Sequence, residues 1–190
     1  MNKDEAVKSV IKDAAKRVFS KWGLNKTTME DIAHEAGKAK STLYYYFKSK
    51  EEIFENLSID ELNIILFKAK AAIKGINSPK DKLKVYIATT FTEIKKTANI
   101  YSLIKGEIKG NKTLIDNIRK RFDISEEAII LEILTLGLKY NEFNFLKDIE
   151  LKKAANVIME IIRGLEINLF LENEDSEKVD IAIRLVVEGL

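Results

Sequence analysis

Residues 27–51 read TTMEDIAHEAGKAKSTLYYYFKSKE, and this stretch decides the fold. The apolar residues of its first half fall at helical spacing, namely Met29, Ile32, Ala33 and Ala36. Thr27, followed three residues later by Glu30, predicts a capping box at the start of this helix. Gly37 predicts its end. The first half is therefore a short amphipathic helix followed by a tight turn.

A second short helix is predicted from about Lys40 to Phe47. Leu43 and Phe47 lie four residues apart and can point inward together. The remaining side chains face solvent or a ligand: Lys40, Ser41, Thr42, Tyr44 and Tyr45. Tyrosine hydroxyls suit phosphate oxygens, and Ser, Thr and Lys can reach base edges in a major groove. Together the two helices predict a helix-turn-helix at about 27–47 that contacts DNA.

Helical periodicity continues in both directions from this motif. The preceding helix carries an apolar face made of Val7, Val10, Ile11, Ala14, Ala15, Val18, Phe19 and Trp22, and Gly23 predicts its end. Ser49 predicts the start of a long helix reaching Ile73, and Ser78 with Pro79 predicts the next helix. Further helices are predicted over 99–108, 112–140, 149–172 and 176–189. The prediction is an all-α chain of about nine helices, with a head at 1–50 and a helical body at 51–190.

Composition narrows the function classes. The 190 residues include no Cys, one His and one Pro, which excludes disulfides, cysteine zinc sites and clusters of several histidines. No apolar run approaches ~20 residues, so no membrane segment is expected. We also expect a cytoplasmic protein that uses no metal or cofactor. Residues 1–50 hold 11 Lys and Arg against 6 Asp and Glu, while the other 140 hold 21 against 24. A basic head favours a polyanionic partner, although lysines clustered there by chance would give the same balance.

The motif carries a family resemblance. It combines Thr27-Thr28-x-x-Asp31-Ile32-Ala33-x-x-Ala36-Gly37 with Thr42-Leu43-Tyr44-x-Tyr46-Phe47-x-Ser49-Lys50-Glu51. This pattern, over about residues 5–55, resembles the DNA-binding signature of the TetR family of transcriptional repressors. The resemblance implies a helix-turn-helix head followed by a ligand-binding and dimerisation domain. It also implies a homodimer that leaves double-stranded operator DNA when a small-molecule effector binds.

The resemblance also assigns DNA contacts. Thr27 and Thr28 would donate to phosphates, and helix N-termini favour phosphate independently. The other implied contacts are Lys40, Ser41 and Thr42 to bases, and Tyr44, Tyr45 and Lys50 to the backbone. Lys38 and Ala39 depart from the family pattern: Lys38 can snorkel over the core and add a phosphate contact, while Ala39 lacks a side-chain cap.

Each assignment has a simpler alternative. Thr27 can serve as a plain N-cap without touching DNA. Tyr46 can pack beneath the second helix of the motif rather than contact DNA. His34, the single imidazole, is interpreted as a surface or partly buried polar residue rather than a catalytic group or pH switch.

In the body, the helix at 149–172 has apolar residues on two sides, and the helix at 176–189 repeats this pattern. Such helices must be buried on two sides, which predicts a symmetric interface between two copies; the alternative is a central position within one monomer. The predicted interface residues are Ile158, Ile161, Ile162, Leu165, Leu169, Ile183, Val186 and Val187.

Aromatic residues of the middle helices predict an effector pocket for an apolar molecule. The candidates are Phe67, Tyr86, Phe91, Tyr101 and Phe122. Aromatic residues at helical spacing more often belong to an ordinary core. A different class of function also fits an all-helical dimer, namely an adaptor protein that binds no specific DNA.

Overall fold

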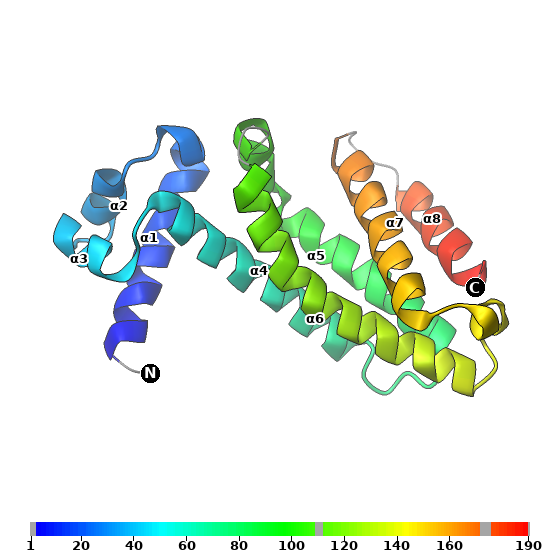
Figure 1. Cartoon of the computed structure of the whole chain (residues 1–190). Coiled ribbons are helices and arrows are strands. Elements are labelled where there is room, and N and C mark those ends of the chain that lie inside the picture. The colour runs from blue at the N-terminus through cyan, green and yellow to red at the C-terminus, as the bar shows by residue number, and fades with distance from the viewer. Residues whose placement is uncertain (1–2, 109–111, 172–175, 190) are drawn as a thin grey trace. The chain divides into compact units, whose positions relative to one another are not determined.

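The computed structural model describes residues 3–108, 112–171 and 176–189, with side chains described except at 97–108, 112, 115, 165–171, 176 and 179. Within these ranges the chain forms eight α-helices, one short 3-10 helix and no strand (Figure 1). The helices are α1 Lys3–Lys26, α2 Met29–Glu35, α3 Lys40–Tyr46, α4 Lys50–Ala72, α5 Pro79–Ile108, α6 Lys112–Lys139, η1 Asn144–Asp148, α7 Leu151–Leu171 and α8 Ser176–Glu188. The predicted all-α class is confirmed.

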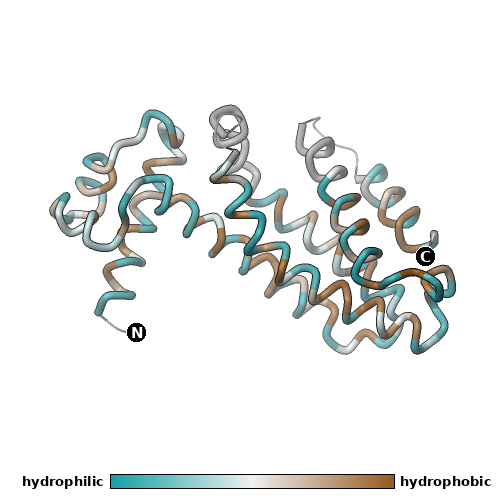
Figure 2. Tube along the Cα trace, viewed as in Figure 1, coloured by the Kyte–Doolittle hydropathy of each residue, from teal (hydrophilic) through white to brown (hydrophobic). Residues whose placement is uncertain are grey.

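The chain divides into two compact units. Unit 1 comprises residues 1–62 and 97–121, and unit 2 comprises 63–96 and 122–190. Because α4, α5 and α6 each supply residues to both units, the units do not divide at residue 50, where the sequence suggests a boundary. Most of these helices carry hydrophilic and hydrophobic residues side by side along their length (Figure 2).

The core of unit 1 joins α1 to the helix-turn-helix. Its buried residues are Ile11, Ala15, Val18, Phe19, Leu24, Met29, Ile32, Ala33, Leu43, Phe47, Ile53, Phe54 and Leu114. Phe19 and Phe54 meet edge to face with ring centroids 5.7 Å apart. Val10 and Trp22, predicted on the same inward face of α1, are each 44% exposed and lie outside this core. Gly23 interrupts α1 at φ 78°, as its predicted role requires, and a last helical turn follows to Lys26.

The core of unit 2 is built from all five of its α-helical segments. It includes Leu66, Leu83, Tyr86, Ile130, Leu134, Phe143, Ile158, Ile162, Ile183 and Val187, all buried. One helix, α5, covers both the segment ending at Ile94 and the one predicted separately at 99–108. The intervening Lys95, Lys96, Thr97 and Ala98 include no Gly or Pro, so nothing breaks the helix there. None of the helices in the described ranges is both long enough and apolar enough to cross a membrane.

Candidate functional site

The first helix of the motif is capped by Thr28, not by Thr27. The Thr28 hydroxyl accepts from the Asp31 amide at 3.2 Å, and the Asp31 carboxylate accepts from the Thr28 amide at 2.8 Å. The Thr28 hydroxyl also donates to this carboxylate at 2.6 Å. These hydrogen bonds hold the pKa of Asp31 below its usual value. The capping box is real but lies one residue later than predicted.

Thr27 is fully buried instead. Its hydroxyl donates to the Gly23 carbonyl at 2.6 Å, in the kink that separates α1 from its last turn. A buried hydroxyl with this partner does not reach a phosphate, so the predicted Thr27 contact is wrong. Thr28 is exposed at the N-terminus of α2, where a phosphate contact remains available.

The turn between α2 and α3 follows the sequence prediction closely. Gly37 has φ 60°, a left-handed conformation that favours glycine although the space around it is open. The Lys38 amide donates to the Ala33 carbonyl at 3.0 Å and closes the turn. Ala39 is the N-cap of α3 and makes no side-chain capping bond, as predicted. Lys38 is exposed.

The two sides of α3 differ sharply. Leu43 and Phe47 are buried together, as their spacing predicts. Tyr46 is half-buried, and its hydroxyl donates to Asp4 of α1 at 2.8 Å, which raises the pKa of Tyr46 and confirms the packing interpretation. Tyr44 and Tyr45 are 48% and 78% exposed. With Lys40 and Ser41 exposed and Thr42 half-buried, α3 presents the polar and aromatic face expected of a DNA reader.

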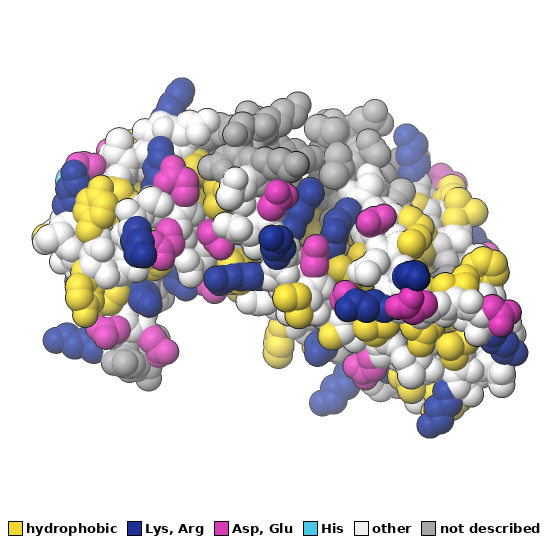
Figure 3. All heavy atoms as spheres, in the orientation of Figure 1, with side chains coloured by type: hydrophobic (Ala, Val, Ile, Leu, Met, Phe, Trp, Pro, Cys, Tyr) yellow, Lys and Arg dark blue, Asp and Glu magenta, His cyan; other side chains and the backbone are white. Residues whose placement is uncertain are grey.

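Two lysines of the motif have partners within the protein. The Lys40 amine forms an ion pair with Glu30 of α2 and lies 5.7 Å from the ring centroid of Tyr44. The half-buried Lys50 donates to the carbonyls of Asn25 and Thr27, at 3.0 and 2.8 Å. Lys50 thus ties the start of α4 to the end of α1, a role that the sequence prediction of a backbone phosphate contact does not include. His34 is exposed, as interpreted. Basic and hydrophobic side chains stand next to one another over the N-terminal helices (Figure 3).

In unit 2, the predicted dimer residues divide between two faces of α7 and α8. Four of them lie in the protomer's own core and are at most 5% exposed: Ile158, Ile162, Ile183 and Val187. Their assignment to a dimer interface is wrong, because neighbouring helices of the same chain already cover them. Ile161 is 42% exposed and Val186 is half-buried. Leu165 and Leu169 have side chains outside the described residues.

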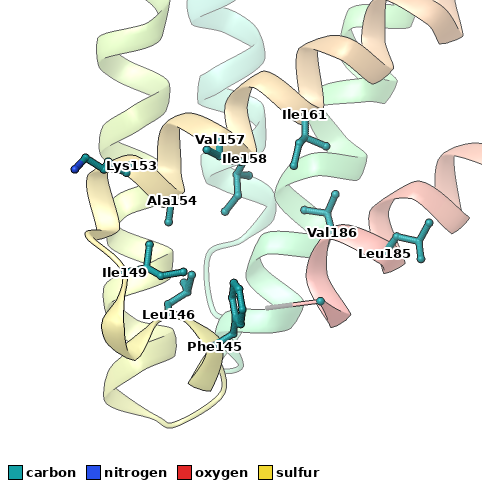
Figure 4. Close-up of a pocket in the computed structure, with 11 residues that line it drawn as sticks. Phe145, Leu146, Ile149, Lys153, Ala154, Val157, Ile158, Ile161, Leu185 and Val186 are labelled. Carbon is teal, nitrogen blue, oxygen red and sulfur yellow. The ribbon is translucent and has the colours of Figure 1, made fainter.

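The opposite face of these helices leaves apolar side chains in solvent. Val157, Ile181 and Leu185 are between 50% and 73% exposed, and Phe145 of η1 is 67% exposed. A groove of about 490 Å³ runs along this face, lined by residues of η1, α7 and α8 (Figure 4). All but two of its lining residues, Lys153 and Gly189, carry apolar side chains. The Lys153 side chain points away from the other labelled residues (Figure 4).

Three of the five predicted pocket aromatics lie in or against the core of unit 2. Tyr86 and Phe91 are buried, and Phe122 is half-buried against this core. Phe67 is 74% exposed, so its assignment to a pocket is wrong. The side chain of Tyr101 lies outside the described residues.

A polar network crosses this core. The Tyr86 hydroxyl donates to Glu126 at 3.3 Å, and Arg163 lies 3.8 Å from the other Glu126 oxygen. Arg163 donates to the more exposed Asp123 at 2.5 Å. Burial raises the pKa of Glu126 to about 7, while Arg163 and Tyr86 act in the opposite direction. The network connects α5, α6 and α7 beside the predicted pocket residues.

Residues 11–57 match the family model described as bacterial regulatory proteins, tetR family. Residues 11–57 therefore form a TetR-family domain. The matched residues run from Ile11 of α1 through the whole helix-turn-helix to Leu57 of α4.

The matches to curated relatives extend beyond the head. Over 146 residues it is 28% identical to the fatty acid metabolism regulator protein of Bacillus subtilis (strain 168), a match covering 74% of this chain and 73% of the relative. Over 141 residues it is 29% identical to the biofilm operon icaADBC HTH-type negative transcriptional regulator IcaR of Staphylococcus aureus (strain Newman), covering 63% and 72%. Like these relatives, the chain is a transcriptional regulator and not an enzyme.

Solved structures share the fold. One is FadR from Bacillus subtilis in complex with stearoyl-CoA, with a TM-score of 0.77, 24% identity, and coverage of 96% of this chain and 98% of that one. Another is the fatty acid degradation regulator FadR from Bacillus halodurans, with a TM-score of 0.75, 20% identity, and coverage of 96% and 95%. The likeness confirms the predicted arrangement of a helix-turn-helix head and a helical body.

Sequence reasoning missed two features of the structure. Lys50 was assigned only to DNA, although a lysine at the start of a helix can also serve the carbonyls of the segment before it. The second missed feature is the burial of Glu126, whose side chain is only 2% exposed. Phe122, Ile129 and Ile130 lie three or four residues from Glu126 and so fall on the same helix face. This spacing is a sequence signal that Glu126 is buried.

Proposed function

We propose that this chain is a homodimeric TetR-family repressor that leaves its operator when an apolar, acyl-bearing effector binds unit 2. The proposal of DNA binding rests on one observation, which is that α3 has one buried face and one exposed face. Leu43 and Phe47 anchor the helix in the head, while Tyr44, Tyr45 and Lys40 are left in solvent. Lysine, serine and tyrosine on the free face of a motif's second helix match the contacts that a major groove and its phosphates accept.

The contacts assigned to DNA are Thr28, Lys38, Lys40, Ser41, Thr42, Tyr44 and Tyr45. Thr28 and Lys38 flank α2 and would meet phosphates, since both are exposed there. Lys40, Ser41 and Thr42 would reach base edges from the first turn of α3, and Tyr44 and Tyr45 would hold the backbone.

A second copy of the chain is the proposed partner of the exposed apolar face on α7 and α8. Val157, Ile161 and Leu185 lie on it, and Val186 borders it. An exposed apolar face of this kind marks an association surface. A two-fold interface also supplies the two heads that read half-sites one helical turn apart, about 34 Å.

The effector class rests on the relatives and on the core of unit 2. The Bacillus subtilis relative is named a fatty acid metabolism regulator, and the structure of FadR from that organism holds stearoyl-CoA. In this chain Tyr86, Phe91 and Phe122 supply an aromatic environment that suits an acyl chain. Arg163 and Glu126 supply nearby polar groups for a carbonyl or an acid.

The test measures binding to the DNA upstream of the chain's own gene by fluorescence anisotropy, with and without a long-chain acyl-CoA or the free fatty acid. We expect binding that weakens as salt increases, and release by one of the two ligands. Tyr45→Ala should weaken binding. A wild-type protein with no salt-sensitive DNA affinity would contradict the proposal and favour the adaptor alternative.

The dimer is tested separately by sedimentation. Ile161→Glu and Leu185→Glu should give monomers, because a charge cannot be buried in the apolar interface. Ile124→Glu on α6 is the matched control, since Ile124 is 73% exposed, as Leu185 is, but does not line the groove. Equal behaviour of all three variants would reject this interface.

A further inference from the structure

An ion pair joins the two helices of the motif across their turn. Glu30 is the second residue of α2 and Lys40 the first residue of α3, and their side chains are 58% and 51% exposed. The Lys40 amine also lies over the ring of Tyr44, 5.7 Å from its centroid. We call these three residues the Glu30–Lys40–Tyr44 group. It stands on the surface that the proposed function assigns to DNA.

The other two acidic residues of α2, Asp31 and Glu35, bind different partners. Asp31 closes the capping box with Thr28. Glu35 binds Arg17 of α1 at 2.6 Å and so faces the first helix of the head. Glu30 differs from both because its partner is a residue of α3 assigned to base contact. Its carboxylate therefore neutralises a lysine that DNA would otherwise attract.

Binding to DNA changes the surroundings of this pair. Lys40 must exchange the Glu30 carboxylate for a phosphate or a base acceptor, and Glu30 is left close to a polyanion. This repulsion acts with every DNA sequence. Hydrogen bonds from Lys40 to a base acceptor, such as guanine N7 and O6, offset this repulsion only at sequences that supply such an acceptor. An unfavourable element of this kind lowers affinity for wrong sequences more than for the right one.

From this geometry, and resting on the proposed DNA-binding function, we propose that Glu30 is a specificity-determining residue. It restrains Lys40 over Tyr44 in the free protein and weakens binding to DNA that lacks an acceptor for Lys40. The cost per exposed ion pair is modest, so the effect is a shift in the ratio of specific to non-specific affinity rather than a loss of binding.

The test compares wild type with Glu30→Gln on two probes. One is a duplex of ~30 base pairs selected by the wild-type protein from a randomised pool, and the other is a mixed-sequence duplex of the same length. Anisotropy titrations run from ~50 to ~200 mM salt. We expect Glu30→Gln to tighten binding to the mixed-sequence duplex about threefold to fivefold and to change binding to the selected duplex by less than about twofold.

Glu35→Gln is the matched control. It removes the same charge from the same helix, and the Glu35 side chain is similarly exposed at 41%, but its partner is Arg17. Glu35→Gln should leave unchanged the ratio of the affinity for the selected duplex to the affinity for the mixed-sequence duplex. Adding Glu30→Gln to a Lys40→Gln protein should also leave the ratio unchanged, because the coupling requires the lysine. Thermal unfolding of each variant checks that the head remains folded.

Four results would overturn the inference. Equal effects of Glu30→Gln and Glu35→Gln on both probes would show a general effect of charge. A tenfold weaker binding of Glu30→Gln to the selected duplex would show that Glu30 contacts a base directly. A wild-type protein that binds neither probe would remove the proposed function and this inference with it, whereas wild-type binding with an unchanged ratio removes the inference alone.

Discussion

The ring of Phe143 packs against Gly137 of α6 so closely that a Cβ on this glycine would lie 1.8 Å from Cδ2 of the ring. Between them, Asn141 adopts φ 58° and ends the helix. The Glu142 amide donates to the Gly137 carbonyl at 2.8 Å, and the Asn141 amide donates to Leu138 at 3.1 Å. This is the hydrogen-bond pattern of a Schellman motif. It turns the chain so that the fully buried Phe143 enters the core of unit 2.

Gly137→Ala should therefore destabilise the protein. The added methyl forces Phe143 out of place, an overpacking effect of about 1–3 kcal/mol, which outweighs the gain of about 1 kcal/mol that alanine brings in a helix. Urea unfolding followed by circular dichroism measures the difference.

Gly164→Ala on α7 is the control for the Gly137 prediction, because a Cβ there meets nothing within 4 Å. It should be neutral or stabilising. If the two alanine variants proved equally stable, the close packing of Phe143 on Gly137 would be wrong.

Glu126 should make stability depend on pH. Its pKa is raised from 4.5 to about 7 in the folded protein, mainly by burial, so the folded state binds its proton more tightly than the unfolded state. Stability is therefore highest at low pH and falls as the pH increases from about 4.5 through 7. The full effect is roughly 3 kcal/mol above that range.

Glu126→Gln removes this dependence. It should raise the melting temperature at pH ~8 and have little effect at pH ~5, where the wild-type carboxyl is largely protonated. Glu127→Gln is the control, because the neighbouring Glu127 is more exposed and binds Lys152 on the surface at 3.3 Å. A Glu126→Gln effect that is equal at both pH values would contradict a neutral buried carboxyl.

The two threonines before α2 should behave differently. Thr28→Ala removes the helix cap and should cost about 1 kcal/mol of stability. Thr27→Val keeps the buried volume but leaves the Gly23 carbonyl without its hydroxyl donor, for a similar cost. Only Thr28→Ala should also weaken DNA binding, since Thr28 is exposed and Thr27 is not. Weaker DNA binding by stable Thr27→Val protein would restore the contact rejected above.

Variants of Lys50 and Tyr45 should affect different properties, namely stability for Lys50 and DNA affinity for Tyr45. Lys50→Met keeps the aliphatic stem but removes the donor to Asn25 and Thr27, so it should lower stability by about 1–2 kcal/mol. Tyr45→Ala should leave stability within ~0.5 kcal/mol, because Tyr45 is 78% exposed, yet it should reduce DNA affinity. Denaturant titration and anisotropy on the same preparations check both. A stable Lys50→Met protein with weakened DNA binding would favour the phosphate role instead.

The position of the helix cap shows what the local sequence can predict and what it cannot. Both Thr27 and Thr28 have an acid three residues later, Glu30 and Asp31 respectively, so the sequence allows either capping box. The structure selects Thr28 because Gly23 turns its carbonyl toward Thr27 and buries that hydroxyl. A kink in a different helix thus decides between two equivalent local patterns.

Spacing along a single segment was enough to predict the all-α class, the turn at Gly37 and the inward pair Leu43 and Phe47. It also showed that α7 and α8 are apolar on two sides. Only the tertiary structure decided that Ile158 and Ile183 belong to the protomer's core while Ile161 and Leu185 remain in solvent. The physical reason is that a helix with two apolar faces gains the same from burying either one, so the neighbouring helices determine which face stays available to a partner.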